Sequence, residues 1–380
     1  MVFLIGRFLP KKMSNKKIKV YLQYPWKNSD SQYYKSILEN PPKGIEYLSM
    51  DMPVGMVLNK KMFKIRTFSK IFLRNFLKFA GISIANIHET KTKEKYDLIH
   101  CTHCLSKNNS LWVADFEAVW QMWILGRESK RSHEKIKNLL LKENCKRIIA
   151  WTETSKKEII TKFPEIKEKI SIIPHAIPLP NIKKKKKTDK IRLLSISRYF
   201  YDKGGLHTLE VFDRLTKKYK NVEAVFVSST PKKIIEKYKQ NEKIRFYDLM
   251  PHKGIIEDIF PSADIFVYPG YSDSFGFIFV EALAFGLPVV TVDGFARKDI
   301  IEHERTGYII EKPRGLSIKK VGKIERELIQ KMVNKISLLI EDKKLREKMS
   351  KDCINVVKNG KFSIWERNKN LRKIYEEAIN

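Results

Sequence analysis

The stretch "YSDSFGFIFVEALAFGLPVV", residues 271–290, decides which fold the sequence predicts. A β-type apolar run, "ADIFVYPG" at 263–270, precedes it. The apolar segment 277–286 then has the composition of a buried helix that ends at Gly286, and Pro288 opens the next strand. A strand, a polar loop and a helix in this order form half of an α/β unit. Ligands of such sheets bind at the carboxyl ends of the strands.

Two acidic residues in this stretch stand at positions that suit a ligand site. Asp273 falls on the polar loop, and Glu281, eight residues later, falls inside the helix. Because both follow the end of a strand, we expect both carboxylates to face a ligand at that edge of the sheet.

Strand-like and helix-like segments alternate along the whole chain, which is typical of parallel α/β layers. In the first half we expect helices at 31–40 and 133–144. The strands expected there are 18–24, 45–50, 97–101, 111–114, 147–151 and 170–173. A second series of strands is expected at 191–197, 222–229, 244–249, 263–270 and 288–294.

The two series are separated by residues 174–190, which carry three prolines followed by five consecutive lysines and show no apolar periodicity. We predict an α/β protein of two Rossmann-like domains whose parallel sheets face each other across a cleft. The first domain is expected at 1–180, the basic linker at 181–190 and the second domain at 191–361. The C-terminal helix 362–380 is a candidate for completing the first domain.

The charge balance favours anionic partners. The chain of 380 residues has 75 Lys and Arg against 43 Asp and Glu, a formal net charge of +32. Such a surface suits nucleic acid, an anionic membrane surface or a phosphorylated substrate. The lysines are dispersed, and no known RNA- or DNA-binding motif interleaves them with aromatic residues, so we expect no nucleic-acid partner.

Cysteine usage and hydropathy indicate a cytoplasmic protein that does not span the membrane. The four cysteines form no dense framework, which suits a reducing compartment. The sequence "HCTHC" at 100–104 is compatible with a metal site, but no second ligand cluster with zinc spacing accompanies it. We expect no metal there and favour a buried strand end. No apolar run approaches the roughly 20 residues of a transmembrane helix.

A second ligand-binding segment is "SRYFYDKGG", residues 197–205, directly after the strand 191–197. It places Arg198 and Lys203 at the carboxyl end of that strand, and Gly204 with the next glycine at the start of a helix. Two cations beside free amide groups suit a diphosphate. The alternative is two solvated cations in a loop, and the acids at 273 and 281 favour the diphosphate site.

These two segments resemble the retaining GT-B glycosyltransferases of family 4. "ISRYFYDKGG" is similar to the segment G-R-x-x-x-x-K-G of that family. "DSFGFIFVEALAFGLPVV" is similar to its paired-acid segment, usually E-G-F-G-…-E-A-…-G-x-P-V-V. Further stretches agree in serial order, so the resemblance covers roughly residues 145–380 and is weak before them.

The resemblance implies a nucleotide-diphosphate sugar as donor substrate and no other cofactor. Arg198 and Lys203 would hold the diphosphate and neutralise the charge of the leaving group. Glu281 would accept hydrogen bonds from the ribose hydroxyls, and Asp273 would face the transferred sugar. The residues implied beside them in donor binding are Gly204, Ser274, Phe275, Gly276 and Phe277.

Two departures from the family pattern concern the reacting sugar. The first acid is Asp273 rather than glutamate, one methylene shorter. The cleft histidine of the first domain has no obvious counterpart, because Ala114 stands in its place, followed by Asp115 and Glu117. We expect these acids to contact the acceptor or the reacting sugar. The alternative is that they cap a helix at a strand–helix turn.

Further groups are candidates for the acceptor side of the cleft. His100, His103 and Thr152 are the side chains that we consider. The family's glycine-rich loop is not recognisable at 24–34, where a helix start capped by Ser29 or Asp30 would stand instead.

A basic amphipathic helix at 66–82 is a candidate for membrane contact. Aromatic and aliphatic residues would share one face, with Lys and Arg recurring beside it. Such a helix suits the interface of an anionic membrane. The alternative is a helix packed on its own domain. We hypothesise peripheral association with the cytoplasmic membrane face.

We therefore expect an enzyme: a metal-independent retaining glycosyltransferase of the hexosyltransferase type, acting in glycan or glycolipid synthesis on a glycan or lipid-linked acceptor. The rivals are a sugar-nucleotide epimerase of the same fold, a basic nucleic-acid-binding protein and a catalytically silent scaffold.

Overall fold

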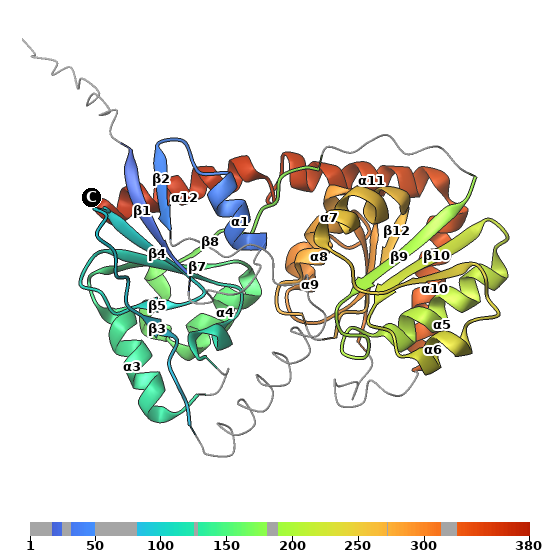
Figure 1. Ribbon diagram of the computed structural model, residues 1–380, viewed down its shortest axis with the longest axis horizontal. Coiled ribbons are helices and arrows are strands. Elements are labelled where there is room, and N and C mark those ends of the chain that lie inside the picture. Colours follow the sequence, from blue (N-terminus) through green and yellow to red (C-terminus); the bar gives the residue numbers. More distant parts are fainter. Residues whose placement is uncertain are drawn as a thin grey trace, which may run out of the picture.

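The protein consists of two α/β domains placed side by side (Figure 1). The computed structural model describes residues 17–24, 32–49, 82–124, 128–180, 189–271, 273–312 and 325–380. Within these ranges we find no helix whose length and hydropathy would suffice for a bilayer span.

The first domain is built on a six-stranded sheet in the order β2-β1-β4-β6-β7-β8, with every pair parallel. Its strands are β1 (Ile18–Gln23), β2 (Ile45–Ser49), β4 (Leu98–Thr102), β6 (Trp112–Phe116), β7 (Cys145–Ala150) and β8 (Ile170–Ile172). A small sheet pairs β3 (Ile87–His88) with β5 (Leu105–Ser106). The helices are α1 (Gln32–Glu39), η1 (Val119–Met122), α3 (Lys130–Leu141), α4 (Glu153–Lys162) and η2 (Pro164–Lys169).

The second domain has six parallel strands in the order β11-β10-β9-β12-β13-β14. They are β9 (Ile191–Ser197), β10 (Val222–Ser228), β11 (Ile244–Tyr247), β12 (Ile265–Val267), β13 (Val289–Val292) and β14 (Gly307–Ile310). The chain runs outward from β9 to β11 and then returns to the other side of β9. The carboxyl ends of β9 and β12 therefore flank the point where the strand order reverses, which is the usual ligand site of such sheets.

Helices cover both faces of the second sheet. They are α5 (Gly205–Lys218), α6 (Lys232–Lys237), α7 (His252–Gly254), η3 (Ile255–Ile259), η4 (Phe260–Ser262), α8 (Phe277–Ala284), α9 (Arg297–Ile300), α10 (Arg326–Glu341) and α11 (Lys343–Lys358). Helix α8 is almost entirely buried, as its apolar sequence predicts. Gly286 follows it with a φ of 68°, and a Cβ there would lie 2.7 Å from Ser350 Oγ of α11. Glycine at this position therefore both ends α8 and lets α11 pack on it.

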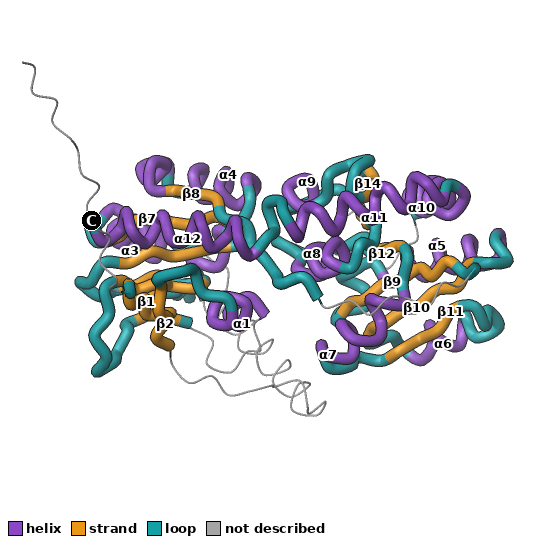
Figure 2. The backbone as a smooth tube through the Cα atoms, turned by 90° about the horizontal axis from the view of Figure 1, so that it is seen from above, coloured by secondary structure: helices purple, strands orange, loops and turns teal. Residues whose placement is uncertain are grey.

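The last helix, α12 (Ile364–Ile379), leaves the second domain and packs against the first sheet (Figures 1 and 2). The Tyr375 hydroxyl lies 2.7 Å from His100 Nδ1 and 3.0 Å from the Tyr47 hydroxyl. Arg367, 2% exposed, donates to Ser36 Oγ at 2.9 Å and to the Asn40 carbonyl at 2.7 Å. These buried contacts fix the end of the chain on the first domain.

Two further sets of contacts join the domains. Trp151, directly after β7, packs against Phe275 and Phe277 of the second domain with ring centroids 5.3 and 5.5 Å apart. His175 lies within the same cluster, 4.7 Å from the Phe277 ring. At the start of α4, the Thr154 hydroxyl donates to Asp299 Oδ2 of α9 at 2.6 Å.

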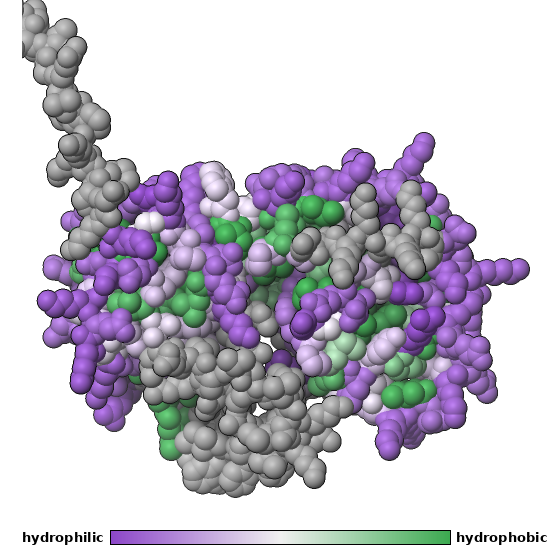
Figure 3. Space-filling model, turned by 45° about the horizontal axis from the view of Figure 1, so that its top comes forward, coloured by the Kyte–Doolittle hydropathy of each residue, from purple (hydrophilic) through white to green (hydrophobic). Residues whose placement is uncertain are grey.

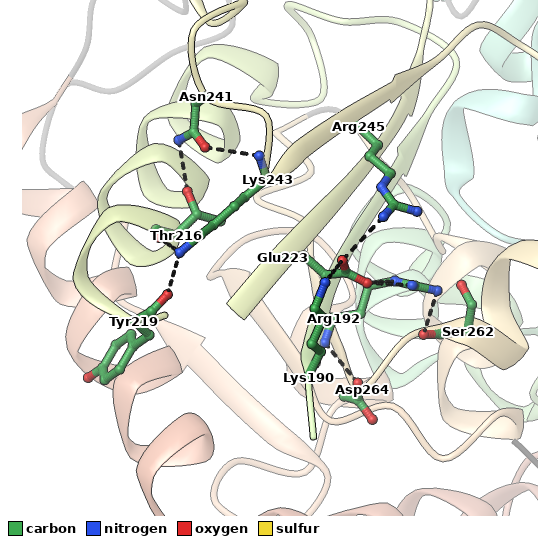
Figure 4. A network of polar contacts seen from close by, with 10 residues as sticks. All are labelled: Lys190, Arg192, Thr216, Tyr219, Glu223, Asn241, Lys243, Arg245, Ser262 and Asp264. Atoms are coloured by element: carbon green, nitrogen blue, oxygen red, sulfur yellow. Dashed lines mark hydrogen bonds and ion pairs between the residues drawn. The ribbon is translucent and has the colours of Figure 1, made fainter. Parts of the chain in front are cut away.

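Near the amino-terminal ends of β9, β10 and β11, several cations surround one carboxylate (Figure 4). Glu223, 8% exposed at its side chain, accepts a 2.8 Å hydrogen bond from Arg192 Nε. Lys190 and Arg245 lie 3.6 and 3.5 Å from its other oxygen. Burial raises the pKa of Glu223, but the cations outweigh it, and the pKa is lowered overall. This cluster ties β9, β10 and β11 together far from the switch point.

The buried His175 predicts a loss of stability in acid. Its side chain is 1% exposed, and neither ring nitrogen has a hydrogen-bond partner among the described residues. Burial, with smaller contributions from Arg367 and His103, holds its pKa well below 6.5. Below about pH 6.5 this histidine therefore binds a proton in the unfolded chain but not in the folded protein. Its contribution to the free energy of unfolding is present above that pH and is lost as the pH falls below it.

We expect wild type to lose about 1.4 kcal/mol more unfolding free energy than His175→Phe between pH 7.5 and 5.5. Phenylalanine keeps the ring contacts and cannot be protonated. Urea denaturation at both pH values measures the difference, and His303→Gln, at an exposed histidine, is the control. Equal losses in wild type and His175→Phe would contradict the interpretation.

Candidate active site

The loops that follow β9 and β12 meet at the switch point of the second sheet. Lys203 Nζ, on the first loop, lies 2.6 Å from Asp273 Oδ1, on the second, and both side chains are largely buried. Gly204 caps α5 with a φ of 80°, and a Cβ there would lie 2.7 Å from Pro269 Cβ. The two loops can therefore approach this closely only with glycine at 204.

Arg297 of α9, which lies outside the sequence motifs, packs beneath the second loop. It is fully buried, and its guanidinium donates to the carbonyl oxygens of Gly270 and Asp273. Its Nη2 atom lies 3.6 Å from Asp273 Oδ2, and its Cζ lies 4.5 Å from the centre of the Phe279 ring. The carboxylate of Asp273 thus faces two cations, one at each oxygen.

Tyr268, also buried, lies close enough to Asp273 for the carboxylate to affect its ionisation. Burial raises the pKa of Tyr268 well above 10, and the negative charge of Asp273 raises it further. The phenol therefore stays protonated beside the acid.

Glu281 lies at a pocket between the domains. Its Oε1 atom is 2.7 Å from His252 Nε2 of α7, and the residue is 8% exposed. The pocket has a volume of about 170 Å³. It is lined by Lys35, Ser36 and Glu39 of α1, by Ile177, Pro178 and Pro180, and by His252, Ile256, Glu281, Ala284 and Phe285. Figure 3 shows apolar surface beside the boundary between the two domains.

Glu117 of the first domain faces the loops of the second. Burial raises its pKa to about 7, Ser274 lowers it by hydrogen bonding, and the charges of Asp273 and Lys203 act in opposite directions. Gln121 holds the carboxylate by donating to Glu117 Oε1 at 3.0 Å. One acid of the first domain therefore shares its electrostatic environment with the Lys203–Asp273 pair, across the domain boundary.

Among the remaining residues implied in donor binding, Arg198 is exposed and Phe275 is buried. Arg198 has an exposed side chain at the start of the first loop, and its carbonyl accepts a 2.8 Å hydrogen bond from the Ser229 hydroxyl. Phe275 is fully buried and belongs, with Phe277, to the aromatic cluster between the domains. Gly276 caps α8 with a φ of 84°.

The other acceptor-side candidates have partners within the first domain. Asp115, 1% exposed, binds His100 Nε2 at 3.1 Å through Oδ2 and the backbone amide of His103 at 3.2 Å through Oδ1. The Thr152 side chain caps α4 in a reciprocal pair with Ser155. These contacts lie within the first domain, and of the two acids Glu117 is the one that faces the second domain.

The alternative that the two acids cap a helix is wrong. The helix after β6 is η1, which begins after Ala118, and its first amide, that of Val119, donates to Glu158 of α4 rather than to either acid. Within the described ranges, no group of three His, Cys, Asp or Glu side chains is arranged to hold a metal ion. The predicted helix 66–82 and the residues Ser29 and Asp30 lie outside the described residues.

Comparisons with known proteins find similarity to glycosyltransferases. Residues 180–355 match the family model described as glycosyl transferases group 1. The chain is 23% identical over 289 residues to the phosphatidylinositol N-acetylglucosaminyltransferase GPI3 subunit of Saccharomyces cerevisiae, covering 70% of this chain and 61% of the relative. It is 27% identical over 242 residues to the capsular polysaccharide biosynthesis glycosyltransferase CapM of Staphylococcus aureus, covering 58% and 59%. The chain thus spans about three fifths of these relatives.

Solved structures show the fold. A glycosyltransferase from Rickettsia africae superposes with a TM-score of 0.61 and 17% identity over 96% of this chain and 99% of its own. HepE of Anabaena, solved with UDP and glucose, superposes with a TM-score of 0.55 and 14% identity, over 95% of this chain and 99% of its own. The GT-B architecture with two parallel-sheet domains, which the sequence predicts, is therefore confirmed.

The proximity of Glu117 to the second domain predicts how two substitutions change its titration. Because the positive charge of Lys203 lowers the pKa of Glu117 and the negative charge of Asp273 raises it, Lys203→Met should raise this pKa and Asp273→Asn should lower it. Carbon-detected NMR of the glutamate carboxyl groups measures both shifts, with Glu117→Gln providing the assignment.

The matched control is Lys217→Met, because Lys217 is an exposed cation of α5 paired with Asp213. It should leave the titration of Glu117 unchanged. If neither Lys203→Met nor Asp273→Asn changed the pKa of Glu117, Glu117 would not belong to this site.

Proposed function

We propose that the protein is a metal-independent retaining glycosyltransferase of family 4. It transfers a sugar from a nucleotide-diphosphate sugar to an acceptor hydroxyl, with retention of the α configuration. The observation that carries this proposal is the 2.6 Å contact between Lys203 and Asp273, which joins the two motif-bearing loops at the switch point of the second sheet. The match of residues 180–355 to group 1 glycosyl transferases supports it.

The donor lies across the carboxyl ends of β9 and β12. Lys203, with the exposed Arg198 at the entrance of the same loop, binds the diphosphate. Glu281 accepts hydrogen bonds from the ribose hydroxyls at the edge of the pocket, where His252 now holds one of its oxygens. Asp273 faces the transferred sugar. The similar protein HepE was solved with UDP, so UDP is the first nucleotide to test.

The chemistry is a displacement on one face of the sugar. The bond between the anomeric carbon and the β-phosphate oxygen breaks while the acceptor oxygen forms the new bond from the same side. The acceptor proton passes to the departing diphosphate, and Lys203 stabilises the charge that develops there. No carboxylate is assigned as a covalent nucleophile, because Asp273 is already held between two cations.

Glu117 belongs to the acceptor side. It approaches the Lys203–Asp273 pair from the first domain, and with a pKa of about 7 its carboxyl group is largely protonated below neutral pH. A protonated carboxyl donates a hydrogen bond to a sugar or acceptor hydroxyl without repelling the diphosphate.

The acceptor is a glycan or a lipid-linked molecule. The names of two relatives describe a phosphatidylinositol N-acetylglucosaminyltransferase subunit and a glycosyltransferase of capsular polysaccharide biosynthesis. The formal charge of +32 suits an anionic surface. We propose that the protein works in the cytoplasm, peripherally on the membrane, with residues 66–82 as the contact.

Lys203→Ala should reduce sugar transfer by a factor of about 100 or more, because the leaving diphosphate loses its stabilising charge. Transfer from UDP-sugars to a panel of lipid and glycan acceptors, followed by mass spectrometry, measures this loss. Lys217→Ala is the control. Near-normal turnover by Lys203→Ala would refute the role. Conversion of the donor to a different UDP-sugar without any acceptor would instead indicate the epimerase.

Glu281→Gln should raise the KM for the donor about tenfold with a smaller change in kcat, because a ribose contact is made equally in the ground and transition states. The same variant should bind UDP and 2′,3′-dideoxy-UDP alike, whereas wild type should prefer UDP. Calorimetry with both nucleotides measures the preference. A preference that survives in Glu281→Gln would place the ribose elsewhere.

A further inference from the structure

We propose that Arg297 is the permanent counter-ion of Asp273, and that it thereby leaves Lys203 available for the donor diphosphate. This inference rests on the proposed function for the identity of the anion. Arg297 does not touch the donor in this arrangement; it is a positioning residue that acts through Asp273.

The contacts of Arg297 fix its guanidinium in place. The side chain is fully buried, and its terminal nitrogens donate to the carbonyl oxygens of Gly270 and Asp273 on the loop after β12. The Phe279 ring packs against the guanidinium at 4.5 Å. A buried arginine held on several sides does not turn toward a ligand, so its charge serves the carboxylate 3.6 Å away.

Lys203 has the opposite character. Its side chain is 13% exposed, it stands on a loop, and its contact with Asp273 is made by an ammonium group that carries two further hydrogens. Of the two cations that share Asp273, Lys203 is the one that can face a diphosphate. Arg297 makes that possible, because Asp273 keeps a counter-ion when Lys203 turns away from it.

The net charge of the site predicts how each variant changes diphosphate binding. At pH 6, where Glu117 is largely uncharged, Lys203, Arg297 and Asp273 sum to +1. Arg297→Met lowers this sum to 0 and leaves Lys203 as the sole partner of a buried carboxylate. Adding Asp273→Asn restores +1 and frees Lys203. Removing the acid from the arginine variant should therefore recover diphosphate binding, which a merely structural arginine would not show.

The test is calorimetry at pH 6 with UDP and, independently of any base, with inorganic pyrophosphate. We expect Arg297→Met to weaken binding of both roughly tenfold, and Arg297→Met/Asp273→Asn to return within about threefold of wild type. Arg297→Lys, which keeps the charge but not the guanidinium contacts, should lose less affinity than Arg297→Met. Asp273→Asn alone should bind about tenfold more tightly than wild type.

The matched control is Arg192→Met at the opposite edge of the same sheet, where Arg192 pairs with Glu223 (Figure 4). It removes an arginine from a carboxylate held by several cations, and it should lower the unfolding temperature without changing UDP or pyrophosphate affinity. A loss of diphosphate affinity in Arg192→Met equal to that in Arg297→Met would show a general charge effect and overturn the inference.

The outcomes separate the two proposals. If wild type binds UDP or pyrophosphate but the double variant remains as weak as Arg297→Met, this inference fails and the proposed function stands. If wild type binds neither, the proposed function fails, and with it the role of Arg297 toward a donor. Should Arg297→Met not fold, the double variant still decides, because removing both members of a buried ion pair is tolerated better than removing one. Binding by the double variant more than tenfold weaker than wild type would then refute the inference.

Discussion

The site depends on one carboxylate that two cations share. Asp273 stands between Lys203 of the loop after β9 and Arg297 of α9, so three separate segments of the second domain converge on a single side chain. A carboxylate this poorly exposed is stable only with counter-ions, because an isolated buried charge is very costly. The sheet topology brings the loops to one edge, and the charges hold them there.

The domain boundary combines apolar packing with a few polar contacts. Trp151, Phe275 and Phe277 pack together between the domains, and α12 carries the end of the chain back to the first domain. Glu117 lies at this boundary next to charges of both signs, and burial is the main cause that raises its pKa to about 7. An acid at this position responds to whatever charge the second domain binds.

Local patterns predicted the elements well. The expected strands at 18–24, 191–197 and 222–229 correspond closely to β1, β9 and β10, and the helix ending at Gly286 is α8. Each has a strong local signal: a short apolar run, or an apolar segment closed by glycine. The sequence pattern did not predict the short strands β3 and β5, because a strand of two residues shows no periodicity.

The partners within the site could not be predicted in the same way. Arg297 follows an irregular loop in "DGFARKD", where nothing local indicates that it will be buried beneath Asp273. Asp115 and Glu117 look equivalent in sequence, yet Asp115 lies within β6 and binds His100, whereas Glu117 lies beyond the end of the strand and faces the second domain. Their difference depends on what packs on each side, which only the tertiary structure supplies.

Helix α9 is a single turn with two attachments. Arg297 reaches inward to the loop that carries Asp273, and two residues later Asp299 accepts hydrogen bonds from the backbone amide and the hydroxyl of Thr154 at the start of α4. One rigid turn therefore touches the first domain on one side and the acid on the other. A movement of the first domain that pulled α4 away from α9 would break the hydrogen bonds to Asp299, so the geometry around Asp273 would respond to the distance between the two domains.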